Sequence, residues 1–584
     1  MIAQVVFDLP LDGPFDYLIP EHLAPQIAVG TRVKVSFSGR TQTGYVIGLL
    51  EKSVIAKLKP IDFLGGTSAA FNSLDLTFAR DFCAYYGCSL GQGLSAILRN
   101  KEGQNPSIYK EHKPQYSLYR CQPGCYEGKI RGIINKYGEH SKGPRFLILV
   151  PDVFRAETLS QQFPSLKIGT RSSVFECDGQ YDCVIMVDEG DTSYKQEQMP
   201  MYDAAQVLLA RSKMFGFDVA FVGVSPSVEL MALAHEKQIK LIEEPDAGGP
   251  SVRLVDLFNY KFIPGMISVP VRDALDAALK AGKKSLLVLN RRGSYRLTRC
   301  VDCAEILKCS HCDSSLIYSR SEGKYLCRHC TYTAAGDTVC PKCHKPNWRS
   351  VGIGVEQLQT ELKKYFPQAK IVAFERGERV IASDRRERSN LLTLGNFDIL
   401  ISTSAVLRFQ GKWQVQMAAF IDFDAELNRL DMRSSFNAFS LARHISSMAL
   451  GPVFIQTRNS DHYVLQSLSS GKVEKFYNEE LKLRKELGFS PFKHWVKISW
   501  RGKSEKSTHQ AAQQAYNELS KSLSKKGCVI TPPLADAVIR KRDQFRFNVM
   551  VQADEVPQAV AFIRSVLGQI KRHSKVIITM NVDP

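Results

Sequence analysis

The sequence predicts a multidomain α/β protein that carries a cysteine-rich, metal-binding insert. Its 584 residues are too many for one hydrophobic core, so several domains are expected. Short apolar runs that suit buried strands recur along most of the chain, with polar stretches of helix length between them. Eight of the 15 cysteines fall into four C-x-x-C pairs within one short region. These patterns indicate sheets covered by helices and a separate metal-bound module.

The N-terminal part has the pattern of a small β-rich module. VVFDLPL, TRVKVSF and TGYVIGLL are short apolar or alternating runs, separated by breaks that contain glycine or proline. Residues 73–98 carry apolar side chains at helical spacing, and a polar linker follows. We therefore predict a β-rich module with a helical extension at the start of the chain.

Two α/β lobes are predicted after this module. FLILV, YDCVIMV and DVAFVGV are continuous apolar runs, and SLLVL, KIVAF, FDILIST and MAAFIDF repeat the rhythm after residue 280. Such runs suit parallel strands that helices cover on both faces. The cysteine-rich insert interrupts the second lobe, and a further α/β domain ends the chain. The predicted boundaries are 1–100 for the module, 101–250 for lobe 1, 251–298 and 351–465 for lobe 2, 299–350 for the insert and 466–584 for the C-terminal domain.

The cysteine pairs predict two closed structural zinc sites. A two-residue spacing lets both thiolates of one turn point at one metal, and two such turns complete a tetrahedron around Zn²⁺. A disulfide framework suits small secreted proteins, whereas this chain is long, rich in lysine and begins without a signal-peptide pattern. The predicted ligands are Cys300, Cys303, Cys340 and Cys343 for one ion, and Cys309, Cys312, Cys327 and Cys330 for the other.

The composition favours an anionic partner and no membrane. A formal charge of +18 attracts polyanions, because each Lys or Arg that neutralises a phosphate releases counterions. Solubility alone is the alternative explanation of the charge. No apolar run approaches the roughly 20 residues that a membrane helix needs. Nucleic acid is the expected partner, and a reducing, cytoplasmic location is expected.

Several segments resemble the primosomal protein N′ (PriA) family of bacterial replication restart proteins. They are VFDLPLDGPFDYLIP, VDEGDTSYKQE, LNRRGSYRLTRCVDC, ELKLRKELGFSPF and the C-terminal ITPPLADAVIRKRDQFRF, in the family's order. The resemblance implies two helicase-like lobes and a role in reloading the replicative helicase at stalled forks. It also implies forked and single-stranded DNA, single-strand-binding protein and other primosome or helicase-loading proteins as partners. A winged-helix domain that the family places before lobe 1 is expected to be missing, because only a short linker stands there.

The resemblance also locates a degenerate nucleotide-binding loop. A P-loop needs G-x-x-x-x-G-K-[S/T], whose backbone amides cradle phosphates and whose hydroxyl holds Mg²⁺. The corresponding segment here has Pro123 for the first glycine and Ile130 for the hydroxyl residue. Glu127 adds negative charge where phosphates would lie, whereas Gly128 and Lys129 keep the family's residue types. ATP and Mg²⁺ are therefore not expected as cofactors.

Two further family motifs lead to the same expectation. Asp188 and Glu189 follow a strand and could still hold Mg²⁺, but Met448 and Gly451 stand where the family has two arginines. Loss of such an arginine costs on the order of 10³ to 10⁵ in rate. We predict a helicase fold without a motor, with Lys129, Asp188 and Glu189 as vestigial residues and no catalytic residue. The alternative is an ATP-dependent 3′-to-5′ DNA helicase, in which Arg443 or Arg433 compensates.

The resemblance places a pocket for the 3′ end of a DNA strand in the N-terminal module. Its residues would be Phe15, Asp16, Tyr17 and Lys59, which could stack on a base, accept from a base and offset backbone charge. Ser38 stands where the family usually has glycine. The alternative is that the aromatic residues belong to a β-barrel core and that Asp16 lies in a turn.

A second predicted DNA-binding segment lies near the C-terminus. Arg540, Arg542 and Arg546 alternate with phenylalanines in IRKRDQFRF, which suits a single- or double-stranded backbone. An amphipathic strand would have the same pattern. A zinc-ribbon protein of RNA or translation is a third possibility for the whole chain, and the segments that resemble the family weigh against it.

Overall fold

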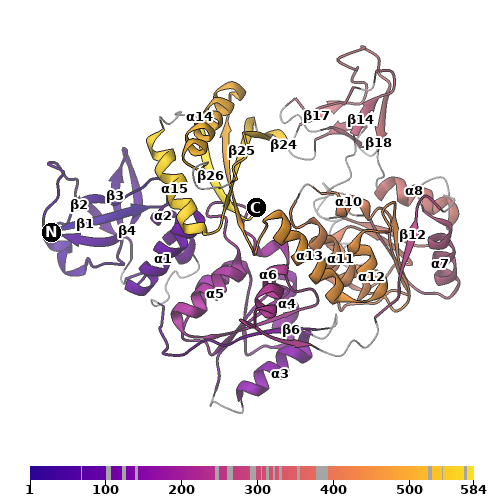
Figure 1. Cartoon of the computed structure of the whole chain (residues 1–584), viewed down its shortest axis with the longest axis horizontal. Coiled ribbons are helices and arrows are strands. Elements are labelled where there is room, and N and C mark those ends of the chain that lie inside the picture. Colours follow the sequence, from indigo (N-terminus) through magenta and orange to yellow (C-terminus); the bar gives the residue numbers. More distant parts are fainter. Residues whose placement is uncertain are drawn as a thin grey trace.

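The computed structural model (Figure 1) gives the arrangement of five parts of the chain. It describes all residues except 67–68, 100–106, 122–125, 139–142, 244–248, 260–266, 290–296, 304, 311–314, 320–322, 328–331, 352–354, 376–391, 430, 524–528, 542 and 571–574. The parts are an N-terminal module, two α/β lobes, a cysteine-rich insert and a C-terminal domain. The multidomain α/β fold that the sequence predicts is confirmed.

The N-terminal module is a five-stranded antiparallel sheet followed by two helices. Its strand order is β2-β1-β4-β3-β5, and its core is built from the apolar residues that alternate along the strands. Ser38 (φ 48°) and Gly39 (φ 79°) both adopt the left-handed conformation between β3 and β4, which tight hairpins require. Ser38 therefore accepts strain at the position where glycine is usual in the family. The elements are β1 (Ile2–Phe7), β2 (Phe15–Leu18), β3 (Arg32–Phe37), β4 (Arg40–Leu50), β5 (Ile61–Leu64), α1 (Ser73–Tyr86) and α2 (Leu90–Leu98), with a 3₁₀ turn at Glu21–Gln26.

Lobe 1 is a six-stranded parallel sheet in the order β11-β6-β10-β9-β7-β8. Its inner strands are apolar on both faces, because helices pack on both. Its strands are β6 (Tyr116–Arg120), β7 (Phe146–Leu149), β8 (Lys167–Gly169), β9 (Cys183–Val187), β10 (Asp218–Gly223) and β11 (Lys240–Glu243). Its helices are α3 (Tyr126–Gly138), α4 (Val153–Gln162), α5 (Ala204–Phe215) and α6 (Val228–His235), with 3₁₀ turns at Arg171–Glu176 and Thr192–Tyr194.

Lobe 2 repeats this architecture in the order β12-β22-β21-β13-β20-β19, again with parallel strands. One continuous cluster of buried apolar side chains includes residues of both lobes, so the two sheets share a core. Its strands are β12 (Val252–Asp256), β13 (Ser285–Val288), β19 (Ile371–Phe374), β20 (Ile399–Ser402), β21 (Met417–Phe420) and β22 (Val453–Thr457). Its helices are α7 (Val269–Lys280), α8 (Val355–Tyr365), α10 (Asp424–Leu427), α11 (Ser434–Ser446) and α12 (Tyr463–Ser470), with a 3₁₀ turn at Ser404–Phe409.

The cysteine-rich insert leaves lobe 2 after β13 and returns before α8. It consists of short antiparallel strands and projects from the lobe at one end of the molecule (Figure 1). A small cluster that includes Cys309 and Cys327 forms its apolar interior. Its strands are β14 (Leu297–Cys300), β15 (Ile317–Ser319), β16 (Lys324–Leu326), β17 (Thr333–Ala335) and β18 (Trp348–Val351).

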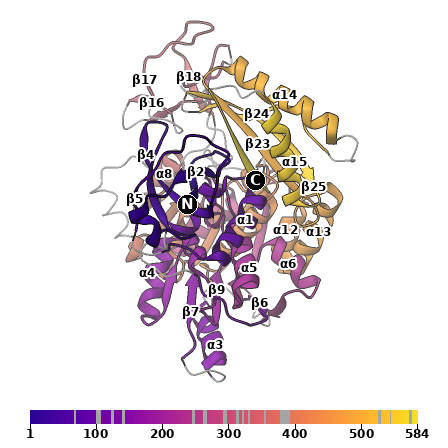
Figure 2. The same ribbon diagram turned by 90° about the vertical axis from the view of Figure 1, so that its left-hand side faces the viewer.

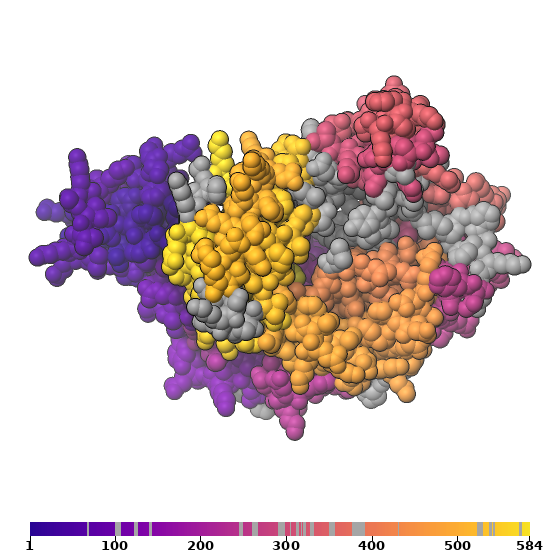
Figure 3. Space-filling model, turned by 45° about the horizontal axis from the view of Figure 1, so that its top comes forward, coloured from indigo at the N-terminus to yellow at the C-terminus, as the bar shows by residue number. Residues whose placement is uncertain are grey.

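The C-terminal domain is a four-stranded antiparallel sheet, ordered β24-β25-β23-β26, with two helices on one face. In the space-filling view it lies between the N-terminal module and the insert (Figure 3). Its strands are β23 (His494–Gly502), β24 (Leu534–Lys541), β25 (Gln544–Ala553) and β26 (Val576–Val582). Its helices are α14 (Glu505–Leu523) and α15 (Val556–Gln569), and α13 (Val473–Leu487) connects the domain to lobe 2.

A short connection joins the N-terminal module to lobe 1. Its described part, residues 107–115, forms no helix or strand. Three aspartates of lobe 1 hold it: Asp178 accepts from the Ile108 amide (3.2 Å), Asp182 pairs with Lys110 (2.7 Å), and Asp218 bonds His112 (2.7 Å). The module is therefore fastened to lobe 1 along this connection.

Within the described residues, none of the helices has the length and apolarity needed to cross a bilayer.

Candidate functional site

The acidic pair Asp188–Glu189 lies at the carboxyl end of β9, the edge where parallel sheets usually bind ligands. Asp188 is buried and has a φ of 48°. The Tyr126 hydroxyl donates to both of its carboxylate oxygens (2.9 and 2.8 Å), and Arg155 Nη1 lies 2.6 Å from Oδ2. His444 Nε2, from lobe 2, lies 3.8 Å from Oδ1. Side chains of the protein itself therefore surround the carboxylate that could hold Mg²⁺.

The two carboxyl groups of this pair are in opposite electrostatic environments. Burial alone would raise the pKa of Asp188, but the charges of His444 and Arg155 and the hydrogen bonds it accepts lower it. Burial raises the pKa of Glu189 to about 7, although Glu189 accepts from the Ser227 amide (2.6 Å). Its other oxygen, Oε2, has no hydrogen-bond partner among the described residues. Asp188 is thus held ionised, whereas Glu189 can be protonated near neutral pH.

Contacts from lobe 2 close the space beside the acidic pair. A Cβ atom at Gly190 would lie 2.7 Å from the ring of Phe436, so a larger residue there would require this ring to shift. Met448 is buried, and a Cβ at Gly451 would lie 2.4 Å from the Gln416 carbonyl. The two positions where the family has arginines are therefore packed against the protein.

Arg433 and Arg443 also contact lobe 1. Arg433 Nη2 lies 3.4 Å from Glu229 Oε1, and Arg484 Nη1 lies 3.1 Å from the same oxygen. Arg443 Nη2 donates to the Val224 carbonyl (3.4 Å). These contacts hold lobe 2 and α13 against lobe 1.

The segment that corresponds to the P-loop is described from Tyr126 onward, whereas Pro123 lies outside the described residues. Ile130 is fully buried in the core between α3 and the sheet, and Lys129 is half-buried on α3. A cavity of about 630 Å³ adjoins the end of β6. Its lining combines Arg120, Cys121 and Arg443 with the first turn of α13, which contributes lysine and glutamate side chains.

The predicted residues of the 3′-end pocket lie on β2 and on the segment beside it. Phe15 is half-buried and packs against Phe37, with ring centroids 5.0 Å apart. Tyr17 is buried, and its hydroxyl donates to the Ser36 carbonyl (3.1 Å). Asp16 is half-buried and accepts a hydrogen bond from Ser53 Oγ.

The backbone of Lys59 lies beside β2, the strand that carries Asp16. Its side chain is exposed, and its carbonyl accepts from the Leu18 amide (2.9 Å). The structure thus brings the segment of Lys59 beside β2 and leaves Asp16 and Lys59 accessible, while Tyr17 belongs to the core of the module.

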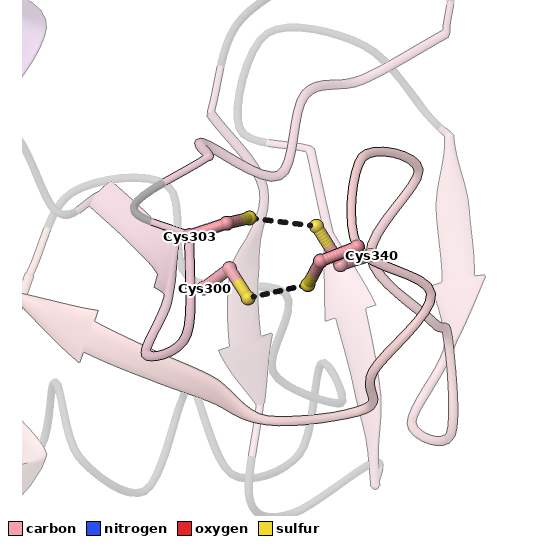
Figure 4. Close-up of side chains that lie close together, drawn as sticks. Cys300, Cys303 and Cys340 are labelled. Atoms are coloured by element: carbon pink, nitrogen blue, oxygen red, sulfur yellow. Dashed lines mark hydrogen bonds between the residues drawn. The ribbon is translucent and has the colours of Figure 1, made fainter.

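Four cysteines of the insert converge on one point. The sulfur atoms of Cys300, Cys303, Cys340 and Cys343 all lie within 4.8 Å of one another. Cys300 Sγ is 3.5 Å from Cys343 Sγ, and Cys303 Sγ is 3.5 Å from Cys340 Sγ (Figure 4). Four thiolates in this arrangement could hold a metal ion. Of the other predicted set, Cys309 and Cys327 are buried in the insert, and Cys312 and Cys330 lie outside the described residues.

The predicted basic segment near the C-terminus lies on β24 and β25. Arg540 Nη1 donates to the Ser310 carbonyl of the insert (3.1 Å), and the guanidinium lies over the Phe545 ring. Arg546 is half-buried on β25, directly opposite Arg501 of β23. Arg542 lies outside the described residues.

Two residues of the acidic site have no recognisable signal in the sequence. Arg155 is a single arginine in the first turn of α4, and Tyr126 stands within the degenerate loop segment. They meet Asp188 only because β6, β7 and β9 are parallel, so that the helices after β6 and β7 begin at the edge where β9 ends.

Known proteins are similar to this chain both in the N-terminal module and along its whole length. Residues 4–99 match the family described as the 3′ DNA-binding domain of PriA. Replication restart protein PriA of Treponema pallidum is 24% identical over 653 residues, covering 100% of this chain and 99% of the relative. The protein of the same name from Rickettsia conorii is 22% identical, with the same coverage. That of Bacillus subtilis is 26% identical over 72% of this chain and 54% of the relative.

Among solved structures, S. cerevisiae Dbp5 bound to RNA and ADP BeF3 aligns with 66% of this chain and 91% of its own. The TM-score of this alignment is 0.34, at 10% sequence identity.

Proposed function

Since the chain is related to replication restart protein PriA along its whole length, as its motifs predict, we propose that it is a replication restart protein. It binds branched DNA at stalled forks and helps to reload the replicative helicase, without unwinding DNA itself. The observation that carries this proposal is the match of residues 4–99 to the 3′ DNA-binding domain.

The edge of the N-terminal module supports recognition of a DNA end. Asp16 can exchange its hydrogen bond from Ser53 for a donor on the terminal base, because a carboxylate accepts from a base N–H. The exposed Lys59 offsets the charge of the nearby phosphate, and Phe15 offers part of an aromatic face. Tyr17 acts from the core, where it fixes the orientation of β2.

The acidic site supports a protein without a motor. To hold Mg²⁺, Asp188 would have to give up its contacts with the guanidinium of Arg155 and the hydroxyl of Tyr126. Breaking a buried ion pair costs free energy, because the guanidinium would remain buried without its partner. Met448 and Gly451 carry no guanidinium group that could neutralise a phosphate, and both positions are packed against the protein. We infer that Lys129, Asp188 and Glu189 are vestigial and serve the fold.

An ATP-dependent 3′-to-5′ helicase is the second candidate. The retention of Asp188 and Glu189 favours it, because these two residue types bind Mg²⁺ and orient water in such enzymes. DNA-stimulated ATP hydrolysis would distinguish it from the first candidate.

The insert is proposed to hold two zinc ions. A tetrahedral Zn–S distance of about 2.3 Å separates the sulfurs by roughly 3.8 Å, which fits the converged cluster of Cys300, Cys303, Cys340 and Cys343. The second ion would use Cys309, Cys312, Cys327 and Cys330. Both sites are closed, so their role is to stabilise the insert.

The remaining parts are proposed to act as an assembly platform in the cytoplasm. Arg540, Arg542 and Arg546 extend the DNA-binding surface to the C-terminal domain. The two lobes and the insert, within the boundaries predicted above, provide surfaces for single-strand-binding protein and helicase-loading proteins.

The proposed function is tested by measuring fork binding and ATP hydrolysis on the same zinc-replete preparation. A fork with a free 3′ end is expected to bind more tightly than a fork whose 3′ end is blocked, with no ATP turnover above background. Equal binding of both forks would contradict the role of the N-terminal module. DNA-stimulated turnover would instead establish the helicase candidate.

Replacing Asp16 by Ala tests the pocket itself. The variant is expected to lose the preference for a free 3′ end, because the base loses its acceptor, while binding of plain duplex is retained. Glu21→Ala, an exposed acidic residue of the same module, is the matched control. Equal losses on both DNAs would show that Asp16 serves only the fold.

A further inference from the structure

The turn between β4 and β5 of the N-terminal module has two apolar side chains at its tip. Within residues 51–60, Val54 is fully exposed and Ile55 is 50% exposed. Figure 1 shows this module at one end of the molecule with β2 on its outer side, and Figure 2 looks onto that end. We call Val54 and Ile55 the apolar tip.

Two further exposed apolar residues lie at the base of this turn. Leu18 of β2 and Leu50 of β4 both stand opposite Ile2 of β1, so their side chains share one face of the sheet. They are 45% and 36% exposed. Asp16 points to the same face, because it is two residues from Leu18 along β2. The predicted acceptor of the DNA end therefore shares its face with exposed apolar residues.

One hydroxyl group connects the apolar tip to Asp16. Ser53 Oγ donates to Asp16 Oδ2 and accepts from the Ile55 amide (3.1 Å). The tip is thus fastened next to the carboxylate by two consecutive hydrogen bonds. Apolar groups that gather on a protein surface beside polar residues mark a site where another molecule binds.

The charge around the apolar tip suits a nucleic acid. Lys52, Lys57 and Lys59 of the same turn are exposed, whereas Glu51 is the one carboxylate in residues 51–60. Proteins that enter a base stack combine apolar wedges with basic side chains, because the cations attract phosphates while the wedge contacts a base face. The composition of this turn matches that combination.

The role proposed for Asp16 requires such a wedge when the DNA end is base-paired. A carboxylate can accept from the pairing edge of the terminal base only after that base has left its partner on the template strand. Opening the last base pair costs pairing and stacking free energy, and it exposes the flat face of the next pair to water. An apolar group that covers this face offsets part of the cost.

We propose that the apolar tip covers the last remaining base pair of a duplex, once the terminal 3′ base has turned toward Asp16. Val54 and Ile55 replace part of the lost stacking, and the exposed leucines at the base of the turn extend the apolar surface. The preferred ligand is therefore a 3′ end within a duplex arm. The inference rests on the proposed recognition of a 3′ end and adds the base pair behind it.

The test measures binding of the double variant Val54→Ser/Ile55→Ser, in the full chain, to two DNAs with a free 3′ end. One 3′ end is base-paired in the arm of a fork, and the other belongs to a single-stranded oligonucleotide. The variant is expected to bind the fork about ten-fold more weakly, because two apolar side chains lose their contact. Its affinity for the single strand is expected to stay within about two-fold of the wild type, since no base pair is covered there.

A fluorescent base reports the opening step itself. 2-Aminopurine is placed in the template strand of the fork, opposite the terminal 3′ nucleotide, where its fluorescence rises when the base loses its partner and unstacks. Saturating wild-type protein is expected to raise the fluorescence, and saturating double variant to raise it less. Unchanged fluorescence with the wild type would overturn the inference.

Val29→Ser is the matched control, since Val29 is an exposed valine of the same module. The residues that follow it, Gly30 and Thr31, bond to β4 on the edge away from β1 and β2. Val54→Ser alone should keep the thermal midpoint, because its side chain is fully exposed, and should still weaken fork binding.

Wild-type affinity of the double variant for the fork would overturn the inference, and so would equal losses on the fork and the single strand. Such a failure leaves the preference of the wild-type protein for a free 3′ end intact. Failure of the proposed function would instead abolish that preference in the wild-type protein.

Discussion

Arg155 and Tyr126 determine what Asp188 can do. A carboxylate at the end of a parallel strand is a common metal ligand, yet here it is buried, ionised and already bonded to a guanidinium and a hydroxyl. The neighbouring Glu189 shows the opposite behaviour, because burial without a positive partner favours its protonated form. The two residues therefore contribute to stability in opposite ways as pH changes.

Arg155→Met is expected to destabilise the protein by about 3 kcal/mol, because it leaves the charge of Asp188 buried without its ionic partner. Chemical denaturation monitored by tryptophan fluorescence measures the change. Arg131→Met is the control, since Arg131 pairs with Glu127 on the surface and such pairs contribute about 0–1 kcal/mol. Equal effects of the two substitutions would mean that Arg155 has no special role.

Glu189→Gln is expected to remove a pH dependence of stability. The folded protein raises the pKa of Glu189 from 4.5 to about 7, so Glu189 favours folding below pH 4.5 and this contribution disappears as pH rises through 7. The wild type should therefore lose up to about 3 kcal/mol relative to the variant between pH 4.5 and pH 8. Urea unfolding at both pH values measures this difference, with the exposed Glu157→Gln as control. Parallel pH profiles of wild type and Glu189→Gln would contradict the assignment.

At the level of elements, the short connection and α1 fix the N-terminal module on lobe 1. Arg211 of α5 is fully buried between Phe78 of α1 and Phe215, with cation–π distances of 4.9 and 4.4 Å. Its Nε donates to the Cys177 carbonyl (2.7 Å). A DNA end held by the module would therefore have a fixed position relative to the lobes.

The cysteine-rich insert is the element whose stability depends on metal. Cys300→Ser is expected to release about one zinc ion per chain and to lower the thermal midpoint, because four-cysteine sites supply folding free energy directly. Metal analysis of the purified variant by mass spectrometry measures the loss. Cys83→Ser, at a buried cysteine of α1, should keep the full zinc content. Unchanged zinc in Cys300→Ser would exclude this residue as a ligand.

At the scale of the whole molecule, the two lobes share one hydrophobic core and are joined across the acidic site. Glu229 of lobe 1 contacts both Arg433 of lobe 2 and Arg484 of α13, and the Tyr477 hydroxyl donates to the Pro226 carbonyl (2.6 Å). A motor must open and close its lobes as nucleotide binds and leaves. Here side-chain contacts join the two lobes and α13.

Magnesium and ATP are therefore expected to leave both the radius of gyration and the thermal midpoint unchanged. Any ligand that binds only the folded state would stabilise it by about 2.7 kcal/mol at a ligand concentration of 100 times the Kd. Such a ligand would therefore raise the thermal midpoint. Small-angle scattering and thermal unfolding at millimolar nucleotide provide the measurement. Forked DNA is the positive control, and a nucleotide-dependent shift would contradict a closed, motorless pair of lobes.

The α/β class, the strand runs, the C-x-x-C pairs and the relationship to PriA could all be predicted from the sequence, because they depend on local spacing and residue type. The roles of Ile130 and Met448 could be predicted only in part. The sequence shows that each lacks the polar group that the family has at its position, but only the fold shows that both side chains are buried in the core. The environment of Asp188 could not be predicted, since Arg155, Tyr126 and His444 stand on three elements far apart in the chain. The same is true of Arg501 and Arg546, whose opposition depends on the register of two strands separated by a long helix. Sequence by itself determined which chemistries the chain carries, and the tertiary structure decided which of them meet, because contacts between distant segments are set by sheet order and packing.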